Sequence, residues 1–242
     1  MPAQLRQFGA ADDLDLEFGQ ADRPSLVTDV LARCGGQGDA AFWWGQPVGR
    51  RIAALLRVLA ATEHRQQVLL TARCGHGGCA ADFEFGLPLD VLAGAADDPG
   101  PVHVALPDAR SATVRLPTGD DLRRWRAAPA GSRAQALGAM LAALVVDGQV
   151  GPDDEAAVAA AIAERDPLVA FAVRCACPAC GAEQDVPVDL EALALARLAA
   201  RQHALLREVH ALATRYGWTE RDVLALPPGR RARYLAFIEE GR

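Results

Sequence analysis

The spacing of apolar residues predicts a chain made mostly of helices. Apolar residues recur every three or four positions over 49–62, in a stretch that begins at Ser132, and over 189–216, which is the period of a helix with one buried face. Gly217, directly after the longest stretch, suits the left-handed conformation that ends a helix. Thr118, followed three residues later by an aspartate, is suited to cap another helix.

Capping residues and prolines mark three shorter helices. Ser25 is suited to cap a helix through Leu31, which the glycines that follow would end. A second short helix is expected over 152–164, after a turn at Asp147. A third begins at Pro227-Pro228, because the proline rings stop the segment before them.

Other segments are patterned as short strands. One apolar run over 66–73 is followed by another over 81–89, and apolar residues alternate with other residues over 102–106 and 112–116. A further apolar run over 169–173 lies ahead of the long helix. Strand and helix patterns together predict an α+β protein that is mostly helical.

The chain contains one short cysteine pattern twice. In each copy an apolar run ends in Arg-Cys and another Cys follows after four intervening residues, first as Cys74 and Cys79 and then as Cys175 and Cys180. Each copy continues into an apolar-Pro-apolar-Asp segment. Two such units, each too small to fold alone, can share one tetrahedral metal ion. We therefore predict two small β units, here called knuckles, that form one split zinc site.

A closed structural zinc site needs four ligands, and the two knuckles offer six candidates. Aligning them on their Arg-Cys pairs places His76 opposite Cys177. The predicted ligands of a structural Zn²⁺ ion are Cys74, Cys79, Cys177 and Cys180. A second set replaces Cys74 with His76, and Cys175 is then a spare thiol or a source of ligand exchange. A redox pair at Cys177 and Cys180 is disfavoured because no βαβ pattern surrounds it.

The predicted zinc ion would connect two remote parts of the chain. Zinc-binding energies of roughly 10–16 kcal/mol in small fingers exceed the loop-closure entropy, which rises only logarithmically with loop length. The resulting regions are a flexible lead-in over 1–23, an N-terminal helical region over 24–65, the first knuckle over 66–95, an insertion over 96–165, the second knuckle over 166–190 and a C-terminal helical region over 191–242.

Composition limits the class of protein. The chain has 242 residues, of which 51% are apolar, so it can bury a substantial core. It has neither an apolar run of about 18 residues nor a secretory signal, which predicts a location in the bacterial cytoplasm and no membrane contact. Reduced, clustered cysteines in that compartment favour a metal over disulfides.

Charge and catalytic motifs exclude further classes. All 25 basic residues are Arg, yet the net charge of −6 argues against a general nucleic-acid binder. His203 and His210 are expected to be structural, and the Trp43-Trp44 pair is expected to anchor packing within the fold or against a partner. No group of residues is spaced for nucleophilic or acid–base catalysis, so we predict that the protein is not an enzyme.

The C-terminal region carries a more specific signal. The stretch 208–220 contains Tyr-Gly-Trp and continues through 223–227 to an Arg-Arg pair in 230–235. It resembles the T-even-like phage baseplate protein family, whose members are hub components or hub-assembly factors of contractile phage tails and related injection systems. The Cys-Pro-x-Cys-Gly knuckle and the segments 49–51 and 115–122 resemble the same group.

The resemblance implies a non-enzymatic structural or assembly protein of a phage-like baseplate. Its partners would be other tail proteins, and the protein would act in the bacterial cytoplasm or within the tail particle. The alternative is a zinc-containing DNA-binding regulator that uses the C-terminal helices, in which Arg230, Arg231 and Arg233 would contact the duplex.

Overall fold

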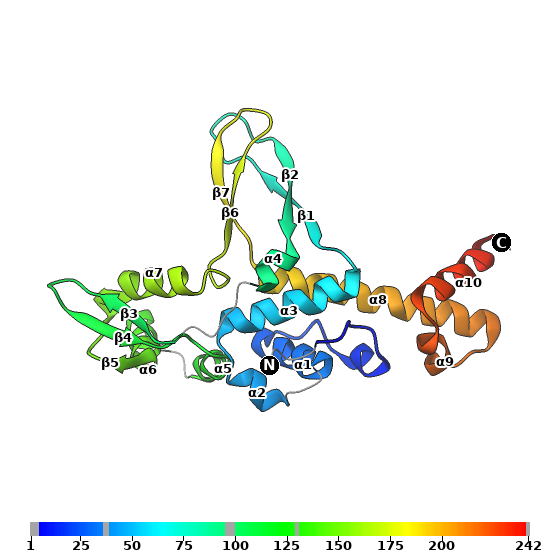
Figure 1. Ribbon diagram of the computed structural model, residues 1–242, viewed down its shortest axis with the longest axis horizontal. Coiled ribbons are helices and arrows are strands. Elements are labelled where there is room, and N and C mark those ends of the chain that lie inside the picture. Colours follow the sequence, from blue (N-terminus) through cyan, green and yellow to red (C-terminus); the bar gives the residue numbers. More distant parts are fainter. Residues whose placement is uncertain (1–4, 36–38, 95–99, 129–130, 241–242) are drawn as a thin grey trace.

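Helices and short antiparallel hairpins make up the protein, which confirms the predicted α+β class (Figure 1). The computed structural model describes residues 5–35, 39–94, 100–128 and 131–240. A helical base occupies the centre, and a pair of hairpins, a small sheet with its helices, and the C-terminal helices project from it (Figure 1). The base contains α1 (Arg23–Cys34), α2 (Ala40–Trp44), α3 (Val48–Glu63) and the first half of α8 (Leu190–Tyr216).

The core of the helical base forms between α1, α3 and α8. The helix predicted over 49–62 is α3, and its Leu55, Leu56 and Leu59 side chains are fully buried on one face, as the spacing predicts. They belong to one apolar cluster with Val30 of α1 and Leu198 of α8. Burying a leucine side chain contributes roughly 1.5–3 kcal/mol, so this cluster stabilises the base without a metal.

Helix α1 is longer than the sequence predicts. It begins at Arg23 rather than after Ser25, because the Asp22 side chain caps it: Oδ1 accepts from the Ser25 N–H at 3.4 Å and Oδ2 from the Ser25 hydroxyl at 2.6 Å. The helix continues beyond Leu31 and ends where expected, at Gly35. Asp22 is therefore the cap, and Ser25 supports it from inside the first turn.

The N-terminal segment differs from the flexible lead-in expected over 1–23. Within its described part, Phe8 and Leu16 are buried in the core of the base. Both guanidinium Nη atoms of Arg6 donate to the buried Asp13 carboxylate at 2.7 Å. Acidic and small residues suggest a free segment, but these few side chains fix it to the base.

Gln202 explains an interruption in the apolar stripe of α8. Its Nε2 atom donates to three backbone carbonyls in and after the short 3-10 helix η1 (Ala11–Asp15), at 2.8–3.3 Å. These carbonyls close η1 against α8. A polar residue on the buried face therefore attaches the N-terminal segment.

Two antiparallel hairpins project together from the base and are here called the tower (residues 67–88 and 172–187) (Figure 1). The first consists of β1 (Gln67–Arg73) and β2 (Asp82–Pro88), and the second of β6 (Ala172–Ala176) and β7 (Glu183–Pro187). Helix α4 (Leu89–Gly94) follows β2 and packs against α3. The tower holds both predicted knuckles at its outer end, away from the base.

The second projection is the insertion between the hairpins. Its sheet has the order β3-β4-β5 and its own apolar cluster with the helices. The elements are β3 (Val102–Ala105), β4 (Ser111–Val114), α5 (Gly119–Ala127), α6 (Arg133–Leu144), β5 (Val145–Asp147), η2 (Pro152–Asp154) and α7 (Glu155–Arg165). Thr118 caps α5 and Ser132 caps α6, as predicted. Strand β5 was not predicted, because Asp147 was assigned to a turn.

Asp166, at the end of the insertion, returns the chain to the base. Its carboxylate accepts a hydrogen bond from the Gly49 N–H at 3.0 Å, in the first turn of α3. Burial raises the pKa of this carboxyl group, and the Gly49 N–H opposes that shift. A Cβ atom on Gly49 would lie 1.7 Å from Asp166 Oδ1, so only glycine fits here.

The third projection contains the end of α8, α9 (Glu220–Ala225) and α10 (Pro228–Glu240). Gly217 ends α8 with φ of 70°, as the sequence predicts, and Thr219 caps α9. Val209, Leu212 and Val223 form the buried part of a small cluster that joins these helices. No helix in the described ranges is long and apolar enough to cross a bilayer.

Candidate metal centre

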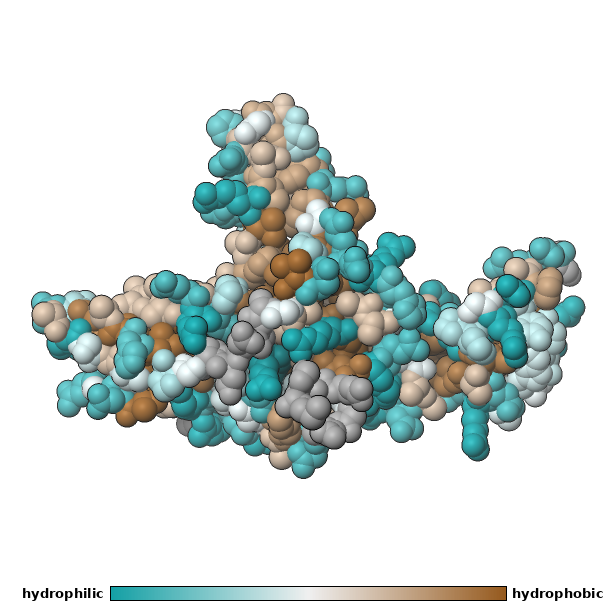
Figure 2. All heavy atoms as spheres, in the orientation of Figure 1, coloured by the Kyte–Doolittle hydropathy of each residue, from teal (hydrophilic) through white to brown (hydrophobic). Residues whose placement is uncertain are grey.

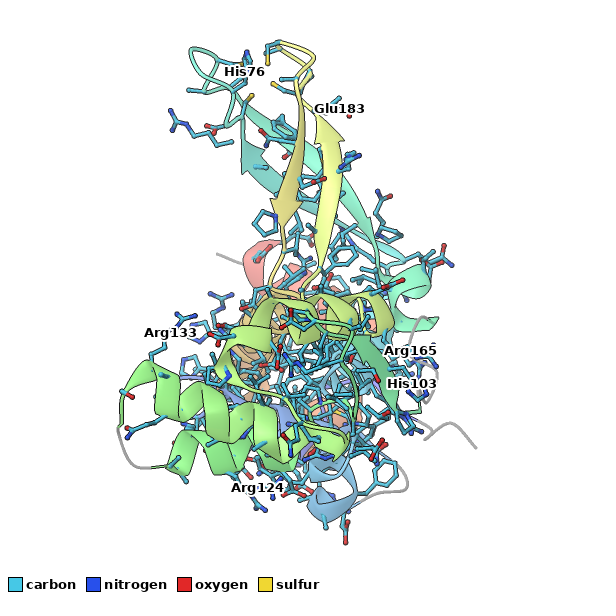
Figure 3. All side chains as sticks on the ribbon, turned by 90° about the vertical axis from the view of Figure 1, so that its left-hand side faces the viewer. His76, His103, Arg124, Arg133, Arg165 and Glu183 are labelled. Carbon is cyan, nitrogen blue, oxygen red and sulfur yellow. The ribbon has the colours of Figure 1, made fainter. Side chains whose placement is uncertain are left out.

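Each hairpin of the tower ends in a tight knuckle that carries two cysteines. In the first, the Cys74 N–H donates to the Ala81 carbonyl at 2.8 Å and so closes the strand pair. In the second, the Cys177 N–H donates to the Ala182 carbonyl at 2.9 Å. These matching hydrogen bonds place both knuckles at the outer end of the tower, where their sulfur atoms meet (Figure 3).

Four cysteine sulfurs from the two hairpins gather at one point. The Sγ atoms of Cys74, Cys79, Cys177 and Cys180 all lie within 4.8 Å of one another. Cys74 Sγ is 3.7 Å from Cys180 Sγ, and Cys79 Sγ is 3.8 Å from Cys177 Sγ. Four sulfurs at about 2.3 Å around one tetrahedral ion would be about 3.8 Å apart. The spacing therefore fits a single tetrahedrally bound metal ion.

The knuckles correspond to one another differently from the alignment on Arg-Cys. The two strand-closing hydrogen bonds make Cys74 equivalent to Cys177, with Cys79 then equivalent to Cys180. The first knuckle has two more residues between its cysteines than the second. His76 therefore lies within this longer loop and is not the counterpart of Cys177. The alignment of the two Arg-Cys pairs missed this difference in loop length, because it assumed that the strands before the two knuckles end at matching residues.

Backbone conformation supports this equivalence. The residue that follows the second cysteine is in the left-handed region in both knuckles, with φ of 48° at Ala80 and 73° at Gly181. Glycine adopts this conformation freely, whereas alanine is strained by its Cβ. The first knuckle is therefore the more strained version of the same turn.

His76 and Cys175 lie outside the group of four sulfurs. His76 is exposed in the loop at the outer end of the tower, and its ring nitrogens are not among the clustered ligand atoms (Figure 3). Cys175 is buried in β6, in an apolar cluster with Phe83 of the opposite hairpin. Of the two predicted ligand sets, the structure brings together the all-cysteine set.

Backbone N–H groups point at the sulfur atoms. The N–H groups of Cys180 and Ala179 lower the pKa of the Cys177 thiol to about 7, against the effect of burial. The His76 N–H lowers the pKa of Cys74, but burial and the neighbouring thiols raise it to about 12. Metals bind the thiolate form, so the lowered pKa of Cys177 favours metal binding at this thiol.

Gln184 joins the two hairpins beside the cysteines, a role that its sequence position did not reveal. Its Oε1 atom accepts from the Gly75 N–H at 2.8 Å, and its Nε2 atom donates to the Arg73 carbonyl at 3.2 Å. Gln184 stands on β7 directly opposite Cys175. It therefore fixes the backbone on both sides of Cys74 and acts as a positioning residue for the site.

Burial around the four sulfurs is uneven. Cys74 and Cys177 are buried, Cys79 is half-buried and Cys180 is exposed. An ion can therefore enter from the side of Cys180 without unfolding of the tower. Once bound, it would have four protein ligands and connect strands that are about a hundred residues apart in the sequence.

The remaining candidate residues lie elsewhere. Trp43 is buried in the core of the base, as an anchor within the fold. The guanidinium groups of Arg51 and Arg123 both lie over the Trp44 ring, at 5.0 and 4.7 Å from its centre. His203 and His210 were expected to be structural, but both are exposed on α8.

Comparison with known proteins adds no assignment. The chain matches no family model, no curated protein and no solved structure. The four-cysteine group is thus the structural feature on which a functional proposal can be built.

Proposed function

We propose that this chain is a non-enzymatic, zinc-stabilised structural or assembly protein of a phage-like contractile tail baseplate. It would act through contacts with other tail proteins. The closed group of four cysteine sulfurs carries the structural part of the proposal, and the sequence resemblance of the C-terminal region carries the baseplate part.

The ligand set supports zinc in a structural role. Four thiolates in a tetrahedral arrangement favour Zn²⁺ among the divalent ions available to a protein. They fill its coordination shell and leave no position for a substrate or a reactive water, as in structural zinc sites. The ion would hold the two hairpins of the tower together.

The shape supports a role in contacts with other proteins. The accessible surface is 13820 Å² for a mass of 25.6 kDa, whereas a compact monomer of this mass exposes about 10,400 Å². Large apolar side chains are exposed on the projections, including Val146 at 56% on β5 and Phe237 at 60% on α10. Figure 2 shows apolar residues interspersed with polar ones on all three projections. Such surface is available for burial in an assembly.

The segment that carries the family resemblance forms one packed unit. The Tyr216 and Trp218 rings stack at 4.8 Å between centroids, and Tyr234 meets both rings edge-on at 5.7 and 5.0 Å. This packing fixes α10 against the end of α8. A rigid helical surface of this kind supports a docking role because little conformational entropy would be lost on binding.

One observation weakens the alternative of a DNA-binding regulator. Arg231 is 5% exposed, and its Nε donates to Glu208 at 2.9 Å. Of the three arginines that this alternative needs, Arg231 therefore already serves packing within the fold. Only Arg230 and Arg233 are exposed.

Deletion of the gene in a host that produces tail particles tests the proposal. We expect particles with missing or incomplete baseplates, restored by the wild-type chain, and co-purification of the tagged chain with tail proteins. Complete, contractile particles in the deletion strain would contradict the proposal. Salt-dependent binding of the purified chain to duplex DNA, abolished by R230A and R233A together, would instead favour the regulator.

A further inference from the structure

A groove lies where the C-terminal helices meet the helical base. Its volume is about 920 Å³, in the upper part of the range of roughly 300–1,000 Å³ that is typical of ligand pockets. Its walls come from the N-terminal segment, the end of α3, the middle of α8 and the joint between α9 and α10. The side chains important here are Phe8, Arg65, Arg197, Arg201, Leu226 and Arg231.

Three of the groove's arginines are already held by two carboxylates. The Arg197 guanidinium donates to both oxygens of Glu63, at 2.6 and 2.7 Å. Arg201 and Arg231 share the Glu208 carboxylate, at 3.1 and 2.9 Å. Because Arg201 and Arg231 share one carboxylate, the three arginines carry one positive charge more than the two glutamates can balance. The ion pairs also hold the guanidinium groups in place before any ligand arrives.

A fourth arginine adds to this excess of positive charge. Arg65 lines the groove, is exposed and makes no ion pair with any other residue in the described ranges. With Glu63 and Glu208 counted, four guanidinium groups face two carboxylates, which gives a local excess of two positive charges. The chain as a whole carries a net charge of −6. The groove is therefore a basic site on an acidic protein.

Apolar side chains complete the walls. Phe8 and Leu205 are 3% and 1% exposed and form a fixed apolar surface. Leu226 and Pro227 also line the groove, at the joint between α9 and α10. Arg231 Nη1 donates to the Leu226 carbonyl at 2.9 Å, so the same arginine fixes this joint.

We propose that this groove binds a short acidic segment of a partner protein, in which acidic side chains flank an apolar one. The inference rests on the proposed function for the claim that the partner is another protein of the same assembly. Guanidinium groups bind carboxylates through paired, charge-assisted hydrogen bonds. The apolar walls would take the residue between the acidic ones. A nucleic acid fits less well, because the basic residues lie in a concavity rather than along an extended face.

Fluorescence polarisation with a labelled peptide tests this proposal on the intact protein. The peptide has the order Glu, Leu, Asp, Leu, Glu between Gly-Ser ends, and the control peptide has Gln and Asn in place of the acidic residues. We expect saturable binding of the acidic peptide alone. R65E should weaken it about tenfold or more, since one charge-assisted contact is lost and repulsion is added. R165E, the same change on exposed Arg165 of α7, should leave binding unchanged (Figure 3).

Three results would overturn the proposal: no binding of the acidic peptide, equal binding of the control peptide, or equal weakening by R65E and R165E. Tighter binding of single-stranded DNA than of the peptide, with the same sensitivity to R65E, would also overturn it in favour of a phosphate ligand. Metal content and thermal unfolding, measured on the same samples, show whether each variant is folded. Because the test uses purified protein, its failure leaves the particle experiment above as a separate test of the proposed function.

Discussion

The helical base and the tower are stabilised in different ways. The base is built around a cluster of 26 buried apolar residues, most of them from α1, α3 and α8 and the segments around them, which also includes Val68 and Leu87 of the tower. The corresponding cluster between the hairpins of the tower has four, and three of these are cysteines. A pair of short hairpins with so little buried apolar area is marginal in water. We infer that the tower would need a bound metal ion for its stability, whereas the base folds by ordinary hydrophobic packing.

Removal of one sulfur ligand should have the largest effect, and only on the tower. In C177A the ion has three protein ligands, and much of a zinc-binding energy of roughly 10 kcal/mol or more is lost. We expect loss of stoichiometric zinc and rapid hydrogen exchange in β1, β2, β6 and β7, with α3 and α8 still protected. The matched control is C175A, two residues away on the same hairpin, which should keep its metal. Equal metal loss in both variants would contradict the ligand assignment.

Mild acid should likewise disrupt the tower before the base. Metal-bound thiolates compete with protons, so zinc should be released as the pH falls toward about 5. In the base, burial raises the pKa of Asp13, but Arg6 and the Gly9 and Ala10 N–H groups outweigh it, so the folded pKa is lowered. The stability from this carboxylate is present above its unfolded pKa of about 3.9 and is lost only as the pH falls through the lower folded value. Zinc release, followed with a chromophoric chelator, should therefore precede loss of helical circular dichroism. Zinc release and loss of helical signal at the same pH would contradict the separate stabilisation of the tower and the base.

The converse variant should weaken the base and spare the tower. In G49A the new Cβ would lie 1.7 Å from Asp166 Oδ1, and the hydrogen bond of 3.0 Å from the Gly49 N–H would be displaced. We expect a loss of about 2–4 kcal/mol in the free energy of unfolding. The measurement is chemical denaturation of the zinc-loaded protein, with zinc content unchanged in the folded state. G19A is the control, since a Cβ there meets no atom within 4 Å.

A smaller effect is expected from the residue that joins the hairpins. Q184A removes hydrogen bonds to the Gly75 N–H and the Arg73 carbonyl. Two such bonds contribute about 1–2 kcal/mol, so zinc affinity in a chelator competition should fall about tenfold. E183A, at the exposed neighbouring position, should not change it. Should both variants bind zinc as tightly as the wild type, Gln184 does not position the site.

The smallest expected effect lies within the tower, between its two knuckles. A80G relieves the strain of a left-handed alanine with φ of 48°, and should slow zinc release by stabilising the first knuckle by about 1 kcal/mol. G181A introduces the same strain into the second knuckle and should speed release by a similar factor. The two substitutions should change the rate of zinc release in opposite directions, because the two positions are equivalent. A change in the same direction in both variants would contradict that equivalence.

Local signals predicted much of this fold. The caps at Thr118 and Ser132, the glycine that ends α8 and the spacing along α3 each depend on a few adjacent residues. The four clustered sulfurs were also foreseen, because each knuckle is a local pattern and the pattern occurs twice. In these cases, the residues that decide the structure lie within one element.

The features that were missed depend on contacts between distant segments. Asp166 meets Gly49, Gln202 closes the N-terminal helix, and β5 joins a sheet edge that local propensity does not reveal. Gln184 positions the first knuckle from the second hairpin, so its role appears only when both hairpins are in place. The burial of Arg231 likewise depends on Glu208, one helix away.

X-ray absorption spectroscopy of the purified protein, together with its zinc content, shows whether one ion is held by Cys74, Cys79, Cys177 and Cys180 from the two hairpins. We predict one zinc per chain with four sulfur neighbours at about 2.3 Å and no nitrogen neighbour. A protein without stoichiometric metal, or an ion with a histidine nitrogen among its neighbours, would contradict this account.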